Sequence, residues 1–246
     1  MRFDIMTLFP ALVDGVLSES IIGRARKAGI IDVRAYNIRD YSKDKHRRVD
    51  DTPYGGGKGM LMSPVPIYDC YTDVVDPEKN PCTRRRVLYM SPQGSVLTQA
   101  KAREFSENYD NIVILCGHYE GVDQRIIDEI VDEEISIGDY VLTGGEIPAC
   151  IVVDAIARLL PGVLADAECY EKESFSDETL LEYPQYTRPY DFRGRTVPEV
   201  LLSGHHANIE KWREQKALEK TKAVRPELIE KRNARLSAEE IKNKKK

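Results

Sequence analysis

Three short segments combine glycine or proline with polar side chains, and each follows an apolar stretch that predicts a β-strand. They are residues 91–94 (Ser-Pro-Gln-Gly), 117–121 (Gly-His-Tyr-Glu-Gly) and 137–146, which ends in Thr-Gly-Gly-Glu. In open α/β sheets, ligands bind in the loops at the carboxyl ends of neighbouring strands. One such loop alone is weak evidence, because strand-to-helix turns need glycine for backbone reasons. The three together predict one pocket for a small molecule.

A second glycine-rich segment, residues 55–59 (Gly-Gly-Gly-Lys-Gly), lacks the features of a phosphate-binding loop. Gly59 stands where such a loop needs Ser or Thr for magnesium, and no apolar strand leads into the segment. A GxGxxG dinucleotide fingerprint is missing from the first strand-to-helix turn, residues 8–10. We therefore expect neither a nucleoside triphosphate nor NAD as ligand. The glycines allow the backbone to lie flat against a planar base; a mobile surface loop is the alternative.

Hydrophobic periodicity predicts alternating strands and helices over the first two thirds of the chain. We expect strands at residues 3–8, 31–38, 86–90, 111–116 and near 135, and helices at residues 10–28, 66–75, 98–108, 123–131 and 146–160. Residues 111–116 are apolar on both sides, which is typical of a central parallel strand. The pattern predicts an α/β fold with a mostly parallel sheet. Residues 40–59 are expected to form a long loop, and loops of that length usually bind or move.

Beyond residue 162 the sequence becomes acidic and rich in turn-forming residues, and it then shows helical patterns at residues 209–220 and 227–235. We therefore expect an α/β domain (1–164), an interdomain linker (165–190) and a small helical domain with a basic tail (191–246).

Charge is distributed unevenly along the 246 residues. The net charge of -5 alone argues against a nucleic-acid partner, yet residues 217–246 carry 10 Lys and Arg against 5 Asp and Glu. Residues 34–48 carry six basic against two acidic residues, whereas residues 120–139 carry eight acidic and one basic. This distribution is typical of a protein with basic surfaces for a polyanion; ordinary solvated faces are the alternative.

The five cysteines form an odd set without a CxxC pair, which predicts reduced thiols in the cytoplasm and no zinc site. The most apolar window, residues 147–165, is interrupted by proline and charged residues and is not a membrane span. Residues 1–10 do not have the pattern of a signal peptide. We expect a cytoplasmic protein without a membrane partner.

Seven motifs are spaced in order through nearly the whole chain. They are residues 54–60 (YGGGKGM), 91–94 (SPQG), 116–123 (CGHYEGVD), 136–146 (SIGDYVLTGGE), 161–163 (PGV), 186–189 (YTRP) and 202–206 (LSGHH). Together they resemble the motifs of the bacterial tRNA (guanine-N1)-methyltransferase family. The resemblance implies a SPOUT fold with a trefoil knot, which is an exception to the rule that connections do not thread. It also implies a homodimer with active sites between subunits, and methylation of N1 of guanosine at tRNA position 37.

The resemblance also implies that the knot loops hold the methyl donor S-adenosylmethionine. The matching positions are Tyr89, Met90, Ser91, Pro92, Gln93, Gly117, Tyr119, Glu120, Ser136, Ile137, Gly138, Tyr140, Leu142, Gly144, Gly145 and Pro148. A carboxylate at Glu120 suits a positively charged sulfonium or ribose hydroxyls. The alternative for Glu120 is a favourable charge before the N-terminus of the helix at 122–131.

Methylation of guanine N1 requires a general base, because this nitrogen carries a hydrogen at neutral pH. The family places a carboxylate just before Ser-Phe, where this chain has Glu173; the family more often has Asp there, and Glu171 is a possible substitute. Arg158 matches the family arginine that would stabilise negative charge on O6, although it could simply be a cation at a helix C-terminus. Mg²⁺ is implied by the family, but the sequence shows no dedicated site.

Contacts with tRNA are expected from the long loop and from the basic C-terminal helices. The loop residues are Arg47, Arg48, Asp50, Gly55, Gly56, Gly57, Lys58 and Gly59. Lys58 replaces the usual proline, which could add a phosphate contact while loosening the loop, and His205 replaces an asparagine for no reason that we can assign. DNA is not expected as a partner. Two alternatives are another SPOUT RNA methyltransferase and a non-catalytic RNA-binding protein with this fold.

Overall fold

The computed structural model describes residues 1–166 and 173–243, with side chains through residue 238. The chain divides into two compact units, Met1–Asp166 and Ala167–Lys246. The functions assigned above to the parts of the chain remain predictions.

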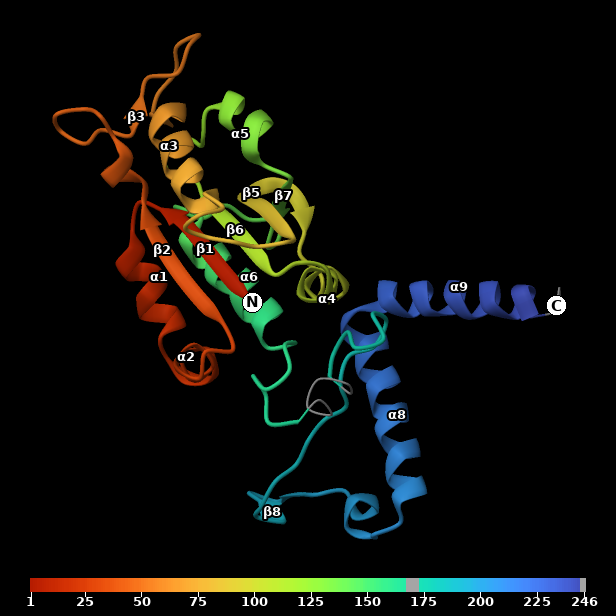
Figure 1. The fold of residues 1–246 in the computed structure, drawn as a ribbon. Coiled ribbons are helices and arrows are strands. Elements are labelled where there is room, and N and C mark those ends of the chain that lie inside the picture. The colour runs from red at the N-terminus through yellow and green to blue at the C-terminus, as the bar shows by residue number, and fades with distance from the viewer. Residues whose placement is uncertain (167–172, 244–246) are drawn as a thin grey trace. The chain divides into compact units, whose positions relative to one another are not determined.

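The first unit is built on a five-stranded sheet with the order β2-β1-β6-β5-β7 (Figure 1). Its strands are β1 (Arg2–Thr7), β2 (Asp32–Asn37), β5 (Arg85–Val96), β6 (Asn111–Cys116) and β7 (Glu133–Ser136). All four strand pairs in it are parallel, so the predicted α/β fold with a mostly parallel sheet is confirmed. The expected central strand is β6, and all of its residues are buried.

Helices cover both faces of this sheet (Figure 1). Helices α1 (Pro10–Leu17), α4 (Gln99–Asn108) and α6 (Glu146–Ala157) pack together on one face, and α3 (Pro64–Val75) and α5 (Gln124–Ile130) pack on the other. Side chains alternate along each strand. Val113 and Leu115 therefore join the core under α3 and α5, while Ile112 and Ile114 are buried on the opposite face.

Two elements differ from the sequence prediction. The helix expected at residues 10–28 is two helices, α1 and α2 (Ser20–Lys27), separated by polar residues 18 and 19. A Cβ on Gly23 would lie 2.0 Å from the carbonyl oxygen of Ser18, so glycine permits the tight turn between them. Apolar periodicity continues through both helices, which explains why it did not reveal the break.

The second difference is that β5 runs through residues 91–94, which were expected to be a loop. Its pairing with β7 shifts between Met90 and Ser95, as at a β-bulge. A Cβ on Gly94 would lie 2.3 Å from the carbonyl carbon of Glu134, so the two backbones approach closely there. The Ser-Pro-Gln-Gly segment is therefore an irregular strand segment, which still lies at the carboxyl edge of the sheet.

The stretch 40–59 is a long loop, as predicted. Its first two residues complete a short 3₁₀ turn, η1 (Ile38–Tyr41), and it contains β3 (Asp50–Asp51), which pairs antiparallel with β4 (Leu61–Met62). Tyr54 at its tip is 98% exposed.

The second unit contains α8 (His206–Val224) and α9 (Pro226–Asn243), which are the two predicted helices with longer bounds. It also has a hairpin of β8 (Asp191–Phe192) and β9 (Arg195–Thr196), followed by η2 (Glu199–Leu202), and the sequence did not predict these. The segment after Glu173 packs on the helices: the Leu181 amide donates to Thr221 Oγ1 at 3.0 Å, and Arg232 Nη1 lies 2.6 Å from Asp177 Oδ2. No helix among the described residues is long and apolar enough to cross a membrane.

Candidate active site

A cavity lies at the carboxyl ends of β5, β6 and β7. The structure brings together around it every residue predicted to bind the methyl donor: Tyr89, Met90, Ser91, Pro92, Gln93, Gly117, Tyr119, Glu120, Ser136, Ile137, Gly138, Tyr140, Leu142, Gly144, Gly145 and Pro148. It adds His118, Gly121, Ile135, Val141 and Thr143, which the sequence analysis did not single out. The added residues lie within or beside the same motifs, so taking each motif whole would have found most of them. That these residues bind a ligand remains a prediction.

Glycines allow the loops around the cavity to touch through their backbones. A Cβ on Gly145 would lie 2.7 Å from Cys116 Cα and 3.0 Å from the Gly117 nitrogen. A Cβ on Gly117 would lie 2.8 Å from the hydroxyl of Tyr89. The Gly145 amide donates to the Gly117 carbonyl at 2.9 Å. Side chains at these positions would overlap the neighbouring loop, so glycine permits the close packing of the loops that line the cavity.

The loop after β7 presents an apolar wall above a tight turn. Ser136 Oγ accepts a hydrogen bond from the Gly138 amide at 3.1 Å and donates to the Gly138 carbonyl at 3.0 Å. Gly138 has a φ of +143°, a conformation that favours glycine. Tyr140 and Leu142 follow and are about half exposed. A wall of this kind with nearby backbone polar groups suits a planar, partly apolar ligand such as a nucleoside base.

Glu120 lies at the mouth of the cavity, against the glycine-rich loop. Its amide donates to the Met60 carbonyl at 3.0 Å, and a Cβ on Gly59 would lie 2.3 Å from Glu120 Cγ. The N-cap of α5 is Asp123, which accepts a hydrogen bond from the Arg125 amide at 3.0 Å. Hydrogen bonds from the Arg125 side chain and amide lower the pKa of Asp123 in spite of partial burial. Asp123 thus caps α5 three residues after Glu120, whose predicted role remains a prediction.

A buried carboxylate, Glu146, supports the floor of the cavity. It is 3% exposed, accepts a hydrogen bond from Thr7 Oγ1 at 2.7 Å, and has Oε2 3.7 Å from His118 Nε2. His118 packs between the rings of Phe9 and Tyr119. Burial, followed by the nearby charge of Glu146, raises the pKa of the Cys116 thiol well above its ordinary value. Cys116 therefore stays neutral and is unsuited to act as a nucleophile.

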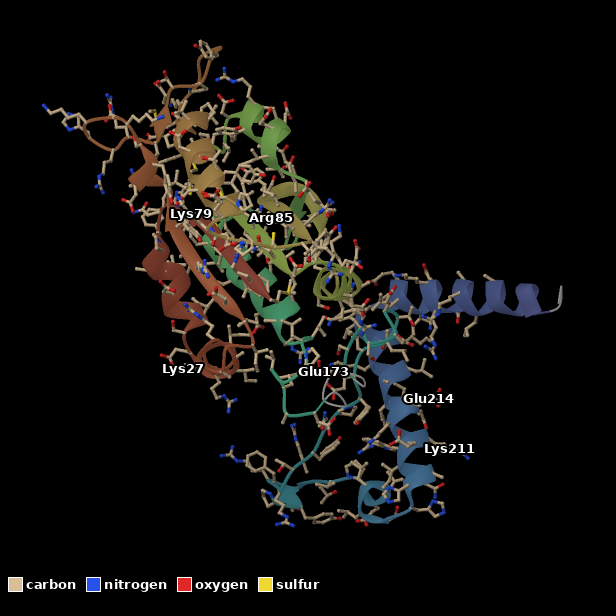
Figure 2. All side chains as sticks on the ribbon, in the orientation of Figure 1. Lys27, Lys79, Arg85, Glu173, Lys211 and Glu214 are labelled. Atoms are coloured by element: carbon tan, nitrogen blue, oxygen red, sulfur yellow. The ribbon has the colours of Figure 1, made fainter. Side chains whose placement is uncertain are left out.

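Of the two other predicted catalytic residues, Arg158 belongs to the first unit but does not line this cavity, and Glu173 belongs to the second unit. Arg158 is the C-cap residue of α6, and it lines a separate surface hollow with Val16, Ile147 and Ile151. Glu173 begins the second described stretch of the chain (Figure 2). Glu171 lies outside the described residues. The first unit by itself therefore contains one of the three predicted catalytic residues at the cavity, Glu120.

The predicted tRNA contacts lie together on the long loop and its base. Arg47 pairs with Asp40 and Arg48 with Asp44, each at 3.0 Å, and both arginine side chains are about 70% exposed. The hydrogen bond from the Arg48 side chain contributes most to lowering the pKa of Asp44 to about 2. The remaining residues of this set are Asp50 in β3 and Gly55, Gly56, Gly57, Lys58 and Gly59 at the tip. Exposed guanidinium groups on a loop are suited to phosphate contacts.

A metal site is not evident in the part of the chain that the structure describes. No group of three His, Cys, Asp or Glu residues is placed there to hold a metal ion.

Comparison with known proteins identifies the family. The family model described as tRNA (Guanine-1)-methyltransferase TrmD matches residues 1–231. A tRNA (guanine-N(1)-)-methyltransferase of Lachnospira eligens is 60% identical, with 94% of this chain and 95% of the relative covered. Proteins with the same name are 58% identical in Ruminiclostridium cellulolyticum (94% and 97% covered) and 54% identical in Clostridioides difficile (95% and 99% covered). With its glycine-lined cavity and this match along nearly its entire length, the chain belongs to the tRNA (guanine-1)-methyltransferase family.

Proposed function

We propose that this protein transfers a methyl group from S-adenosylmethionine to N1 of guanosine at position 37 of tRNA. The observation that carries the proposal is the cavity at the carboxyl ends of β5, β6 and β7, which is lined by every residue expected to bind the methyl donor. The relatives' names supply the substrate class and the methylated atom. Position 37 follows from the family resemblance alone.

The residues that line the cavity suit the proposed methyl donor chemically. Gly117 and Gly145 let the loops that line the cavity pack closely against one another, and Tyr140 and Leu142 provide an apolar wall for adenine. Glu120 places a carboxylate at the mouth, where it would stabilise the positive sulfonium or accept hydrogen bonds from ribose hydroxyls. When bound, S-adenosylmethionine supplies an electrophilic methyl group.

The chain's own residues would supply acid–base and electrostatic catalysis. Glu173 would remove the N1 hydrogen of guanine, which frees the nitrogen lone pair for attack on the methyl carbon. Negative charge then develops on O6, and the Arg158 guanidinium would stabilise it. Glutamate reaches one methylene further than the aspartate that is more usual here, so its approach to N1 should differ. The reaction as proposed uses no step through Mg²⁺, which remains an implication of the family.

An unpartnered apolar face favours a homodimer with the active site between subunits. Five large apolar side chains on this face are between 41% and 49% exposed. They are Phe9 just before α1, Leu12 and Val16 on α1, and Ile147 and Ile151 on α6. Helices α1 and α6 pack side by side, so these side chains can form one patch of the kind that marks protein interfaces. Arg158 lines the hollow beside this patch. We propose that a second copy covers the patch, with Arg158 and Glu173 completing a site at the interface.

The finer features of the fold are proposed on the same basis. The SPOUT-type trefoil knot would be formed by the loops that line the cavity. tRNA would contact the exposed loop at 40–59 and the helices of the second unit, where α8 carries five Lys and Arg residues against three Glu residues. A protein that modifies tRNA is expected in the cytoplasm.

A methyl-transfer assay with matched substrates tests the proposal against its alternatives. The protein is incubated with labelled S-adenosylmethionine and tRNA transcripts that carry guanosine or adenosine at position 37. Labelling of the guanosine transcript alone is expected. Labelling of both transcripts would favour another RNA methyltransferase specificity, and tRNA binding without S-adenosylmethionine binding would favour a non-catalytic RNA-binding protein.

Replacement of the proposed base gives the largest expected effect on catalysis. Glu173→Gln keeps the size of the side chain but cannot accept the N1 proton, so single-turnover transfer should fall by about 10²- to 10⁴-fold. The dissociation constant of S-adenosylmethionine should stay unchanged. Glu178→Gln is the matched control, because Glu178 is an exposed acid in the same segment that pairs with Lys231 at 3.5 Å. Equal rates for Glu173→Gln and the parent would rule out Glu173 as the base.

A further inference from the structure

The long loop at residues 40–59 is fixed to the cavity at both of its ends. Before the loop, the Arg39 guanidinium donates from Nη2 to the Tyr119 hydroxyl at 3.2 Å. After it, the Glu120 amide donates to the Met60 carbonyl at 3.0 Å, and the Met62 amide donates to the Gly121 carbonyl at 2.9 Å. Both ends of the loop therefore contact the same short stretch, residues 119–121, which lines the cavity.

Arg39 is held in place by the end of β2. It lies in η1, where its amide donates to the Asn37 side chain at 3.1 Å, and Ile38 beside it is fully buried. The core thus anchors the turn that carries Arg39. From this turn the Arg39 guanidinium reaches Tyr119, which lies 80 positions later in the chain.

Tyr119 has a backbone conformation that needs external support. Its φ is +60°, in the left-handed region that non-glycine residues rarely adopt without support from the surrounding structure. The ring is 44% exposed, so packing covers only part of it, and His118 touches it edge-on with ring centroids 5.6 Å apart. The Arg39 hydrogen bond therefore contributes to holding a strained residue of the cavity.

The position of the Glu120 side chain depends on the C-terminal end of the loop, at Gly59. Gly59 has a φ of +95°, and even one added carbon there would lie 2.7 Å from Glu120 Oε1. The Glu120 side chain thus lies directly on the Gly59 backbone. A change in the loop at Gly59 must move the carboxylate, and a change in the carboxylate must be accommodated at Gly59.

We propose that Arg39 is a positioning residue that couples the tRNA-binding loop to the methyl-donor cavity through its hydrogen bond to Tyr119. This inference rests on the proposed function, because it assumes that tRNA binds the loop and the methyl donor binds the cavity. Ordering of the loop by tRNA then favours the Tyr119 and Glu120 conformations that line the cavity. By linkage, a ligand in the cavity strengthens tRNA binding by the same factor.

The coupling is measured with the full chain, a tRNA transcript and S-adenosylhomocysteine, which lacks the transferable methyl group. The dissociation constant of tRNA is determined with and without saturating S-adenosylhomocysteine, and the ratio is the coupling factor. The parent should give a factor of about 5 or more. Arg39→Met and Tyr119→Phe remove the donor and the acceptor of one hydrogen bond, so each should reduce the factor to about 2 or less, and the double variant should go no lower.

Lys43→Met is the matched control. It removes a cation from the same loop, but the partner of Lys43 is Asp69 in α3, at 2.7 Å. This variant should keep the parental coupling factor even if tRNA binds more weakly. A parental factor near 1, or an unchanged factor in both Arg39→Met and Tyr119→Phe, would overturn the inference. Failure of S-adenosylhomocysteine to bind the parent at all would instead contradict the proposed function itself.

Discussion

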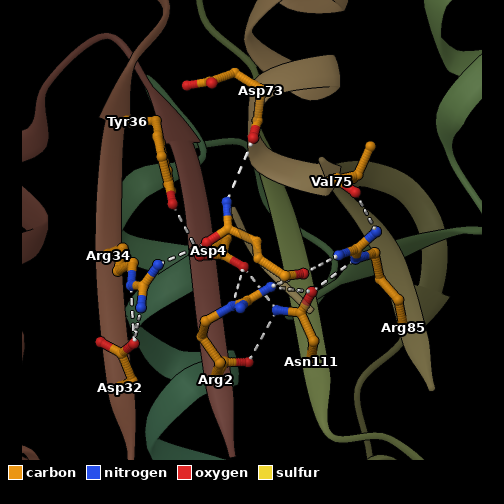
Figure 3. Close-up of polar contacts among 10 residues, drawn as sticks. Arg2, Asp4, Asp32, Arg34, Tyr36, Asp73, Val75, Arg85 and Asn111 are labelled. Atoms are coloured by element: carbon orange, nitrogen blue, oxygen red, sulfur yellow. Dashed lines mark hydrogen bonds and ion pairs between the residues drawn. The ribbon is translucent and has the colours of Figure 1, made fainter. Parts of the chain in front are cut away.

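The two ends of the central sheet use polar residues in opposite ways. At the amino end, Asp4 and Asn111 are fully buried and form a network with Arg2 and Arg85 (Figure 3). Asp4 Oδ2 accepts from Arg2 Nε at 2.8 Å and from Asn111 Nδ2 at 2.7 Å, and Asn111 Oδ1 accepts from Arg85 Nε at 2.7 Å. The buried polar groups of this network therefore form hydrogen bonds with one another.

At the carboxyl end, the loops hold strained or glycine-dependent backbone around an open cavity. Tyr119 has a positive φ, and Gly117, Gly144 and Gly145 lie so close to neighbouring protein atoms that a Cβ on any of them would clash. The exposed Glu120 lies at the rim of this cavity. The same parallel sheet thus has one end where polar groups stabilise the fold and another where they remain available for a ligand. Substitutions at the two ends should therefore affect different measurements.

The largest effect on stability is expected at Asp4. Asp4→Ala leaves Arg2 and Asn111 without their shared carboxylate in a buried site, which should lower the free energy of unfolding by about 3–5 kcal/mol. Urea denaturation measures this loss. S-adenosylmethionine affinity of the folded protein should be unchanged. Loss of affinity without loss of stability would break the comparison between the two ends.

The corresponding substitution at the carboxyl end is Gly145→Ala. Its Cβ would lie 2.7 Å from Cys116 Cα, and backbone cannot rotate aside as a side chain can. Overpacking of this kind costs about 1–3 kcal/mol. We expect the two loops to move apart to relieve this contact; if the ligand has to bring them back together, S-adenosylmethionine binding should weaken by up to about 5- to 150-fold in a calorimetric titration. Wild-type affinity would show that the loops are less closely packed around the ligand than proposed.

An exposed ion pair at the amino end tests whether burial, and not the presence of an ion pair, makes the Asp4 network important for stability. Arg34 Nη2 lies 2.7 Å from Asp32 Oδ2, with both side chains nearly half exposed. Because water already solvates both charges, Asp32→Asn should lower the free energy of unfolding by about 1 kcal/mol or less. A loss as large as that of Asp4→Ala would mean that burial is not what distinguishes the network.

The smallest effect concerns pH. Partial burial alone would raise the pKa of Asp110, but hydrogen bonds from the Thr83 side chain and from the Arg84 and Thr83 amides outweigh it and lower the pKa. Stability from Asp110 should therefore be present above about pH 4, its ordinary range, and be lost as pH falls through the lower folded value. The difference in unfolding free energy between the parent and Asp110→Asn should shrink over that interval. A difference that grows on acidification would contradict this sign.

The sequence predicted the sheet and the residues around the cavity better than it predicted where individual helices and strands begin and end. Alternating apolar runs identified the strands, and the motifs at their carboxyl ends identified the loops that the structure brings together. The break before α2 and the continuation of β5 through residues 91–94 depend on close backbone contacts at Gly23 and Gly94, which periodicity cannot detect. The Arg39–Tyr119 contact joins residues 80 positions apart, so no local pattern could have revealed it.

The network at the amino end was also missed, for a different reason. Asp4 lies in an apolar strand, where a single charged residue gives no indication of its partners. Its bond to Asn111 forms only because β1 and β6 are neighbours. Hydrogen-bond partners on neighbouring strands can be identified only once the order of the strands in the sheet is known, and the local sequence does not give that order.

The most direct test of the account is the identity of the methylated nucleoside. Guanosine-37 tRNA is treated with the protein and S-adenosylmethionine carrying a labelled methyl group, and the product is then digested to nucleosides and separated. We expect the label to appear in 1-methylguanosine. Label in any other nucleoside, or no label in the RNA, would contradict it.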